Sequence, residues 1–327
     1  MARTCAIRFA LLAALLAAAL PAQPSGKVPE AAGKAFDAGD YPRAIAAINA
    51  AIAAAPREAP LHHFLAQCYF ESEQFDRAIP PAETAVALDP GNSLYHELLG
   101  RAYGEKADRS SWFSGLSLAK KARKEFEIAV RLDPRNYSAA QALIEYDCTA
   151  PGIAGGGEDK ARAEIEKLAQ LDAAEGHYAR GNCRRQKKDF AAADAEFRKA
   201  LALDPGSADL IYDIGDYYSK HDQPQPLGLV LAEGQRAVPD DPRTNFYRAV
   251  ADILEKKDAD TSDQRLREYL ANTPRRSNYP SPAMTHYWLG RLQENRNDLA
   301  GAKREYREAL NLEPKNRYAS EALKRLQ

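Results

Sequence analysis

Histidine and cysteine have the widest chemical repertoire in this chain, because their side chains act as nucleophiles, general bases and metal ligands. The 327 residues include six histidines and four cysteines. The sequence contains no HExxH, CxxC or GxSxG motif, and none of its 46 acidic residues stands out as half of a catalytic pair. We therefore predict a non-enzymatic protein with no metal and no cofactor. An enzyme that uses Cys183 or His177 is kept as a third hypothesis.

Four histidines recur at one position of a repeating pattern: His62, His96, His177 and His286. Each is the fourth residue of a predicted helix, so we assign these side chains to packing. Equivalent positions in successive repeats lie about 10 Å apart. That spacing is too wide for a shared zinc ion, whose bonds to nitrogen are about 2.0–2.1 Å long.

The cysteines are too few for a disulfide scaffold. Cys5 lies in the N-terminal segment, which leaves Cys68, Cys148 and Cys183. Three cysteines cannot all pair within one chain, so at least one free thiol is expected, or none of them pair. Cys68 and Cys183 occupy equivalent positions of two predicted helices, and we interpret both as small, half-buried helix residues.

Two inserts could carry function. Residues 150–158 contain three consecutive glycines before a predicted helix, an arrangement that can bind an anion. No strand precedes them and no Gly-Lys-Ser/Thr follows, so we interpret them as a turn with positive φ angles. The insert near 104–120 carries Trp112 and Phe113, which we propose as an exposed anchor for a partner. The alternatives are that Trp112 packs the longer loop onto its neighbours, or that the preceding helix is simply longer.

The elements that position these residues follow from self-similarity in the sequence. A segment recurs in which Ala, an apolar residue, Ala and Pro are separated by three, two and four residues. Each copy ends at a proline or an equivalent residue. The ends of successive copies lie about 34 residues apart, or further where residues are inserted. The five clearest copies, in that order of residues, are 44/48/51/56, 78/82/85/90, 122/126/129/134, 193/197/200/205 and 302/306/309/314.

Each copy predicts the second helix of a pair, because a pattern with helical spacing also precedes it. Short polar turns separate the two helices, and an aspartate in each turn is expected to cap the second helix. These aspartates are Asp40, Asp76, Asp189 and Asp298. Asp-Pro pairs at 89–90, 133–134, 204–205 and 241–242 are expected to end the second helices. The recurring alanines allow close helix contact, and one pair cannot bury its apolar face alone, so the pairs must stack.

The period and the motif resemble those of the tetratricopeptide-repeat family. The resemblance implies an all-α protein, an α-solenoid that forms a right-handed superhelix of helix-turn-helix repeats. It implies eight units over 27–314 and a C-terminal capping helix at 315–327. The expected inserts lie near 104–120, 150–158, 221–228 and 274–282. Two units depart from this pattern. Unit seven lacks the pair of small residues that allows close contact between helices, and residues 221–226 interrupt unit six. Together the two earlier inserts resemble those of exported bacterial repeat proteins.

In that family the first helices line a concave groove. Certain positions of each first helix point into this groove. Transferring those positions to this chain gives the predicted groove residues, which are Arg101, Tyr178, Asn182, Arg185, Tyr212, Asp216, Tyr287 and Arg291. Tyrosine beside arginine suits a polar or extended polypeptide. We expect a protein or peptide partner of unknown identity. The alternative is an envelope glycan or a small ligand bound by Tyr178, Tyr212 and Tyr287.

The N-terminal segment predicts export. Arg3 and Arg8 precede an apolar stretch over residues 9–20, as in a secretory signal peptide spanning 1–22. Cleavage is expected after Ala22, and an uncleaved anchor is the alternative. We therefore expect a periplasmic or secreted protein of the cell envelope. A net charge of −1 and a pI near 6.6 argue against nucleic acid as a partner and against membranes apart from export. The oligomeric state stays open.

Overall fold

The computed structural model describes residues 27–274, 276 and 278–326. Within these ranges the protein consists of α-helices and one short 3-10 helix, with no strand. The prediction of an all-α repeat solenoid is therefore confirmed. The predicted signal peptide at 1–22 lies outside the described residues. None of the helices in the described ranges combines the length and the apolar character that crossing a bilayer requires.

The first half of the chain supplies α1 (Glu30–Asp37), α2 (Tyr41–Ala54), α3 (Ala59–Glu71), α4 (Phe75–Leu88), α5 (Ser93–Asp108), α6 (Trp112–Leu132), α7 (Tyr137–Thr149), η1 (Gly152–Ala154) and α8 (Glu158–Leu171). The second half supplies α9 (Ala173–Gln186), α10 (Phe190–Leu203), α11 (Ala208–Lys220), α12 (Pro224–Ala237), α13 (Pro242–Leu254), α14 (Ala259–Asn272), α15 (Pro282–Asn295), α16 (Leu299–Leu312) and α17 (Arg317–Arg325).

Three of the four predicted caps are present. The side chains of Asp40, Asp189 and Asp298 each accept a hydrogen bond from a backbone N–H in the first turn of the following helix. The prediction for Asp76 was wrong, because α4 begins at Phe75, one residue before Asp76. Gln74 therefore holds the cap position. Asp76 instead forms an ion pair with Lys106 of the next helix pair, at 2.7 Å.

The Asp-Pro pairs end three second helices as predicted. Helices α4, α6 and α10 each stop at the leucine before such a pair. The pair at 241–242 has the opposite role. Helix α12 already ends at Ala237, and Pro242 is the first residue of α13 with Asp241 as its cap. Proline suits this position because the first turn of a helix has no backbone acceptor for its N–H groups.

The insert near 104–120 lengthens both helices of a pair. Helix α5 has 16 residues and α6 has 21, whereas α3 and α4 of the preceding pair have 13 and 14. Trp112 is 69% exposed, so it does not pack the connection onto neighbouring helices. The insert at 150–158 forms η1 and a turn in which Gly155 and Gly157 have positive φ, as predicted.

The other two inserts are connections between helices. In the segment near 221–228 the turn is short, and α12 already begins at Pro224. The segment near 274–282 joins α14 to α15, and residues 275 and 277 within it lie outside the described part. Its described Tyr279 lies against Arg243 of α13, whose guanidinium carbon is 4.8 Å from the ring centroid.

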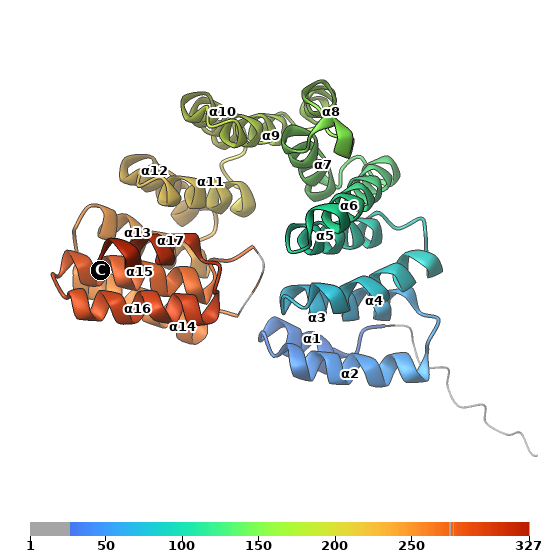
Figure 1. Ribbon diagram of the computed structural model, residues 1–327, viewed down its shortest axis with the longest axis horizontal. Helices are drawn as coiled ribbons and strands as arrows, with labels where there is room; N and C mark the ends of the chain where they lie inside the picture. The colour runs from blue at the N-terminus through green and yellow to red at the C-terminus, as the bar shows by residue number, and fades with distance from the viewer. Residues whose placement is uncertain (1–26, 275, 277, 327) are drawn as a thin grey trace, which may run out of the picture.

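Successive helix pairs curve into an open ring (Figure 1). The first and last pairs face each other across it, and α3, α5, α7, α9, α11 and α15 lie toward its inner side. One ion pair connects the two ends of the curve, since Arg276 of the α14–α15 loop lies 3.3 Å from Asp37 at the end of α1. The curvature therefore brings together residues 239 positions apart.

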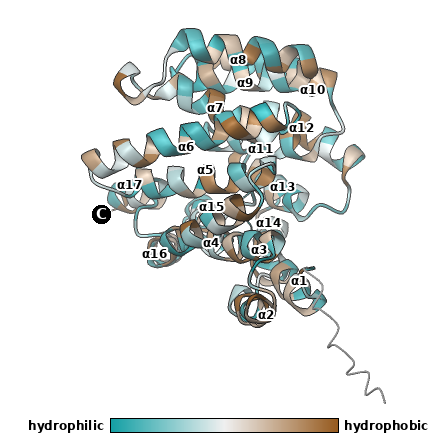
Figure 2. Ribbon diagram, turned by 90° about the vertical axis from the view of Figure 1, so that its right-hand side faces the viewer, coloured by the Kyte–Doolittle hydropathy of each residue, from teal (hydrophilic) through white to brown (hydrophobic). Residues whose placement is uncertain are grey.

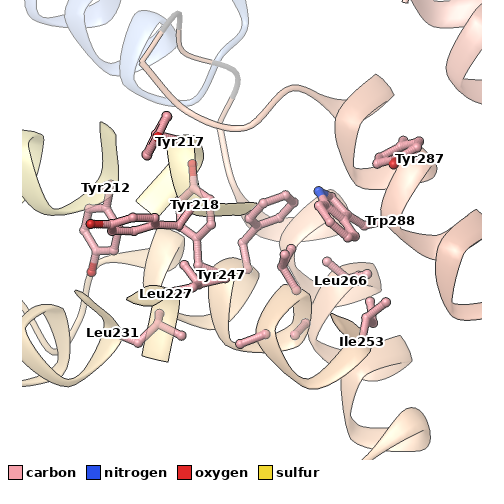
Figure 3. Packing of buried hydrophobic residues seen from close by; sticks show 14 of the residues in the cluster. Tyr212, Tyr217, Tyr218, Leu227, Leu231, Tyr247, Ile253, Leu266, Tyr287 and Trp288 are labelled. Atoms are coloured by element: carbon pink, nitrogen blue, oxygen red, sulfur yellow. The ribbon is translucent and has the colours of Figure 1, made fainter. Parts of the chain in front are cut away.

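The core runs between the helices rather than through one centre. Figure 2 shows hydrophobic and hydrophilic residues alternating along the helices, as expected for elements buried on one face. The largest buried cluster spans α10 to α17 and is rich in aromatic side chains, among them Tyr212, Tyr247 and Trp288 (Figure 3). A second large cluster spans α1 to α7. Stability is therefore distributed along the repeats.

Candidate functional site

The predicted groove residues come together most closely where α9 meets α11. The Tyr178 hydroxyl of α9 donates a hydrogen bond to Asp213 Oδ2 of α11, at 2.9 Å. Tyr178, Asn182 and Arg185 share one face of α9 and are all half-buried. We call these four residues, Tyr178, Asn182, Arg185 and Asp213, the α9–α11 cluster. The two helices that carry it, α9 and α11, lie toward the inner side of the ring (Figure 1).

Electrostatics distinguish this cluster from ordinary surface residues. The pKa of Asp213 is raised to about 6 by burial and by the carboxylates of Asp209 and Asp216, against the opposing hydrogen bond from Tyr178. Burial and the charge of Asp213 also raise the pKa of the Tyr178 hydroxyl well above its ordinary value. Tyr178 therefore stays protonated and donates, while Asp213 can gain or lose a proton near neutrality.

The basic member of the cluster is free to pair with a ligand. Arg185 forms no ion pair with any carboxylate in the described ranges, although its charge reaches Tyr178 and Tyr217. Asp216, in contrast, already pairs with Lys220 at 2.6 Å along α11. A guanidinium that is partly desolvated and unpaired is a strong binding site for a carboxylate.

Two predicted groove tyrosines are buried instead, which corrects the prediction for them. Tyr212 is 2% exposed, and its hydroxyl forms a short hydrogen bond with Thr244 of α13. Its ring stacks on Tyr247 and lies under the guanidinium of Arg243. Tyr287 is also buried, against Trp288, in the aromatic core (Figure 3). On α11 it is the neighbouring Asp213, not Tyr212, that contacts Tyr178 of α9.

Arg291 and Arg101 have structural partners. The Arg291 guanidinium donates hydrogen bonds of 3.1 Å to both Asp222 and the Tyr287 hydroxyl, and so links α15 to the α11–α12 turn. Arg101 lies over the Phe70 ring, 4.6 Å from its centroid, and 4.0 Å from Glu97. Both side chains hold neighbouring elements together, which makes them less suited to a ligand than Arg185.

A ladder of polar contacts between successive first helices was not predicted. Ser138 of α7 donates to Glu97 of α5 at 2.6 Å. Gln141 of α7 donates to Glu175 of α9 at 2.7 Å, and Tyr178 continues the series to Asp213. The partners lie 34 to 41 residues apart, close to the repeat period. That spacing is the sequence signal that could have identified the ladder.

The histidines link the two helices of a pair, in agreement with the packing prediction. His96, His177 and His286 place Nδ1 within 2.6 to 2.7 Å of a glutamate on the second helix of the same pair. His62 differs, since its Nε2 contacts the Pro56 carbonyl at 2.8 Å. In the described residues, no group of three or more His, Cys, Asp or Glu side chains is arranged to hold a metal ion.

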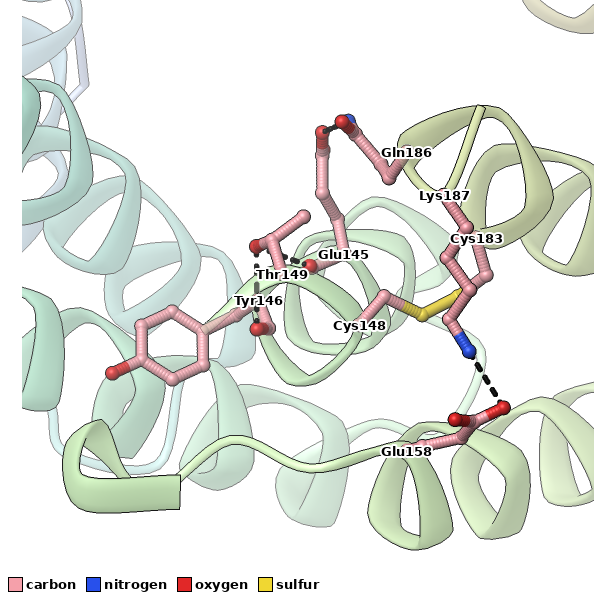
Figure 4. The surroundings of a disulfide bond; sticks show 8 residues. All are labelled: Glu145, Tyr146, Cys148, Thr149, Glu158, Cys183, Gln186 and Lys187. Atoms are coloured by element: carbon pink, nitrogen blue, oxygen red, sulfur yellow. Dashed lines mark hydrogen bonds and ion pairs between the residues drawn. A yellow bond between two sulfur atoms is a disulfide. The ribbon is translucent and has the colours of Figure 1, made fainter. Parts of the chain in front are cut away.

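One disulfide was not predicted. Cys148 of α7 and Cys183 of α9 are bonded, with Cα atoms 5.6 Å apart (Figure 4). Of the two alternatives left open, a pair with one free thiol and no pairing at all, the structure has the first, because the α7–α9 contact brings Cys148 and Cys183 together. Cys68 is free and buried, and burial raises the pKa of its thiol to about 12. Cys68 is thus unreactive in the folded protein.

Two cavities in the described part of the chain lie away from the α9–α11 cluster. One, of about 290 Å³, is bounded by α14, α15, α16 and the α14–α15 loop, with Tyr269 and His286 in its wall. The other, of about 570 Å³, lies between α12 and α13 and is lined by Leu231 and Arg248. Neither contains a predicted groove residue. The predicted anchor residues Trp112 and Phe113 lie elsewhere again, exposed at the start of α6.

Comparison with known proteins identifies the repeats. Models of the tetratricopeptide repeat match residues 35–102, 174–207 and 285–316. No curated protein matches the chain. A thermophilic tetratricopeptide-repeat protein of Thermus thermophilus, TTC0263, is similar in structure, with 20% identity, a TM-score of 0.45, and coverage of 55% of this chain and 91% of that one.

Two further structures are similar along most of the chain. A tetratricopeptide repeat protein from Parabacteroides merdae shares 11% identity, with a TM-score of 0.47 and coverage of 90% of this chain and 95% of that one. The Cut9–Hcn1 hetero-tetramer of APC/C shares 16% identity, with a TM-score of 0.49 and coverage of 90% of this chain and 54% of that one.

Proposed function

We propose that this chain, which contains tetratricopeptide repeats, is a scaffold of the cell envelope that binds a protein or peptide on its inner side. Repeats of this family generally serve as non-catalytic scaffolds for protein interaction. Fold alone does not assign a function, so the proposal depends on a particular site.

The α9–α11 cluster is the observation that carries the proposal. Its unpaired Arg185 offers two parallel N–H groups to a carboxylate. The Asn182 side chain hydrogen-bonds the Tyr178 hydroxyl, and its amide oxygen and second N–H are left for a peptide bond. Tyr178 and Asp213 are held in place by their mutual hydrogen bond. Because these groups project from two rigid helices, they are organised before the ligand arrives, which lowers the entropic cost of binding.

The burial of two tyrosines favours a polypeptide over a glycan. The glycan alternative requires exposed aromatic rings on which sugar faces can stack. Tyr212 and Tyr287 are enclosed in the core, which leaves only Tyr178 of the three predicted rings, and its hydroxyl is already bonded to Asp213. The remaining exposed groups are amide, guanidinium and carboxylate, which match the chemistry of a peptide.

Export to an oxidising compartment is part of the proposal. The disulfide between Cys148 and Cys183 supports it, because such bonds persist outside the reducing cytosol. The predicted signal segment over 1–22 supports it from the sequence. Attachment of alkaline phosphatase after residue 327 tests the location, since that enzyme is active only after export, and an inactive fusion would contradict it.

A matched pair of charge reversals tests the binding site. Arg185→Glu changes the α9–α11 cluster, and Arg162→Glu makes the same change on α8, where Arg162 is exposed and pairs only with Asp159 along its own helix. We expect Arg185→Glu to abolish recovery of an envelope partner by the tagged protein, and Arg162→Glu to preserve it. Equal recovery with both variants would contradict the proposed site.

A further inference from the structure

The outer end of the α5–α6 hairpin presents two exposed aromatic side chains. Trp112 and Phe113, the first residues of α6, are 69% and 85% exposed. The chain's other tryptophan, Trp288, is 1% exposed. Aromatic rings usually contribute their large apolar area to a core or an interface. An adjacent pair left in water at the end of a lengthened hairpin indicates contact with another surface.

Positive charge surrounds these rings. The segment from Lys106 to Lys124 contains six basic residues and one acidic residue, whereas the whole chain contains 45 basic and 46 acidic residues. No acidic residue occurs between Trp112 and Lys124. Lys106, Arg109 and Arg123 pair with carboxylates. The local excess therefore rests on Lys120, Lys121 and Lys124, and it favours an anionic partner surface.

Two of the lysines and the Phe113 ring share one face of α6. Phe113, Lys120 and Lys124 are separated by seven and four residues, so their side chains point in the same direction. The opposite face is buried through Ala122 and Phe126. At 1.5 Å per residue, Lys120 and Lys124 lie about 10 and 17 Å along the helix from Phe113.

The lysines on this face are available to a partner. Lys120 and Lys124 are exposed, and neither forms an ion pair with a carboxylate of the described residues. Ile153 adds a further apolar side chain, 72% exposed, on η1, which contacts α6.

We propose that this hairpin end docks onto an anionic lipid bilayer. A bilayer surface presents anionic phosphates above an apolar layer, so lysines and aromatic rings separated by about 10–17 Å meet both at once. Tryptophan and phenylalanine insert at the interface, and nearby lysines are attracted to the anionic phosphates. The contact lies on the membrane and does not span it. Docking would hold the repeats against the envelope with the α9–α11 cluster unobstructed.

A vesicle-binding assay tests the proposal. The protein used is the chain from Gln23 onward, which contains every described helix. The probes are vesicles of phosphatidylcholine with about one-third phosphatidylglycerol, and vesicles of phosphatidylcholine alone. We expect the protein to sediment with the anionic vesicles at least about tenfold more strongly. The emission of Trp112 should shift to shorter wavelength as it enters the interface, while the buried Trp288 contributes a constant background. Equal binding to both vesicles, or no binding, would refute the proposal.

Matched variants assign the binding to the hairpin. Trp112→Ser with Phe113→Ser should lower vesicle binding at least about tenfold, whereas Leu229→Ser, at a residue 66% exposed on α12, should leave it unchanged. Lys120→Glu with Lys124→Glu should abolish the preference for anionic lipid, and Arg307→Glu with Lys315→Glu should retain it. Trp112→Phe should keep binding but lose the emission shift. Circular dichroism confirms that each variant folds.

The outcomes distinguish a lipid bilayer from a protein as the partner of the hairpin end. Retained sedimentation of the Trp112→Ser, Phe113→Ser variant would overturn the proposal, and so would an emission shift caused by a soluble protein in place of vesicles. The result is independent of the peptide-binding proposal, because Arg185→Glu changes the inner side and should leave vesicle binding unaltered.

Discussion

Glycines at the contact between paired helices set how closely those helices approach. A Cβ atom on Gly290 of α15 would lie 2.4 Å from the Tyr306 ring of α16, and one on Gly181 of α9 would lie 2.6 Å from the Phe197 ring of α10. Both rings are buried. Since a real side chain cannot approach so closely, the helix pairs require glycine at these positions.

We expect Gly290→Ala to lower the free energy of unfolding by about 1–3 kcal/mol, because the added methyl group overpacks the contact with Tyr306. Gly104→Ala is the matched control. Gly104 also lies within a helix, α5, but nothing occupies the space around its missing Cβ. That control should be neutral or raise stability by up to about 1 kcal/mol. Urea denaturation measures both, and equal effects would contradict the packing argument.

Asp213 makes the stability of the protein depend on pH. Its folded-state pKa of about 6 lies above the ordinary value of 3.8, so the folded protein binds the proton more tightly than the unfolded chain does. The free energy of unfolding therefore falls as pH rises from about 4 to about 6. We expect Asp213→Asn to stabilise the protein more at about pH 7.5 than at about pH 4. An identical gain at both pH values, measured from urea midpoints, would count against the raised pKa.

At the scale of helices, the disulfide fixes one junction of the array. It joins α7 to α9 and closes a loop of 35 residues that includes η1 and α8. Closing such a loop restricts the unfolded chain more than the folded one. Contacts around the bond also cross the junction, since Lys187 pairs with Glu158 at 2.6 Å and Gln186 donates to Glu145 at 2.9 Å (Figure 4).

Replacing Cys148 and Cys183 by serine should lower the free energy of unfolding by about 2–4 kcal/mol. A reducing agent should have the same effect on the parent protein and no effect on the variant. Cys68 serves as an internal control, because its buried thiol should react with a labelling reagent only when the protein unfolds. Unchanged denaturation midpoints after reduction would show that the bond contributes nothing to stability.

The sequence predicted the helices well where a repeated pattern defined them. Alanine spacing and Asp-Pro pairs located α4, α6 and α10, because local chemistry determines where a helix ends. It failed where position depends on neighbours in space. Whether Pro242 ends one helix or begins the next, and whether Cys148 reaches Cys183, depends on how consecutive pairs stack. A single sequence does not contain that information.

The site residues were predictable to a lesser degree. Helical spacing alone places Tyr178, Asn182 and Arg185 on one face of α9. Transfer of inward positions misplaced Tyr212, which is buried, and overlooked Asp213, because the contact of Asp213 with Tyr178 depends on how α9 packs against α11. Arg291 was predicted from its own helix, but its partner Asp222 lies 69 residues away. Long-range pairing of this kind follows from the curvature of the whole array.

At the scale of the molecule, the curve determines which surfaces can act. Its inner side carries the α9–α11 cluster and the polar ladder, and its ends approach each other through Arg276 and Asp37. That pair is exposed, so it contributes no more than about 1 kcal/mol. The ring is therefore held mainly by packing between neighbouring repeats.

Site-specific crosslinking in living cells tests the central claim most directly. A photoreactive amino acid replaces Asn182 on the inner side or, as the control, Arg162 on α8, and mass spectrometry identifies the products. The proposed function predicts that the probe at position 182 captures one defined envelope protein and that the probe at position 162 does not. Capture of that protein only from position 162, or with equal yield from both, would contradict binding on the inner side.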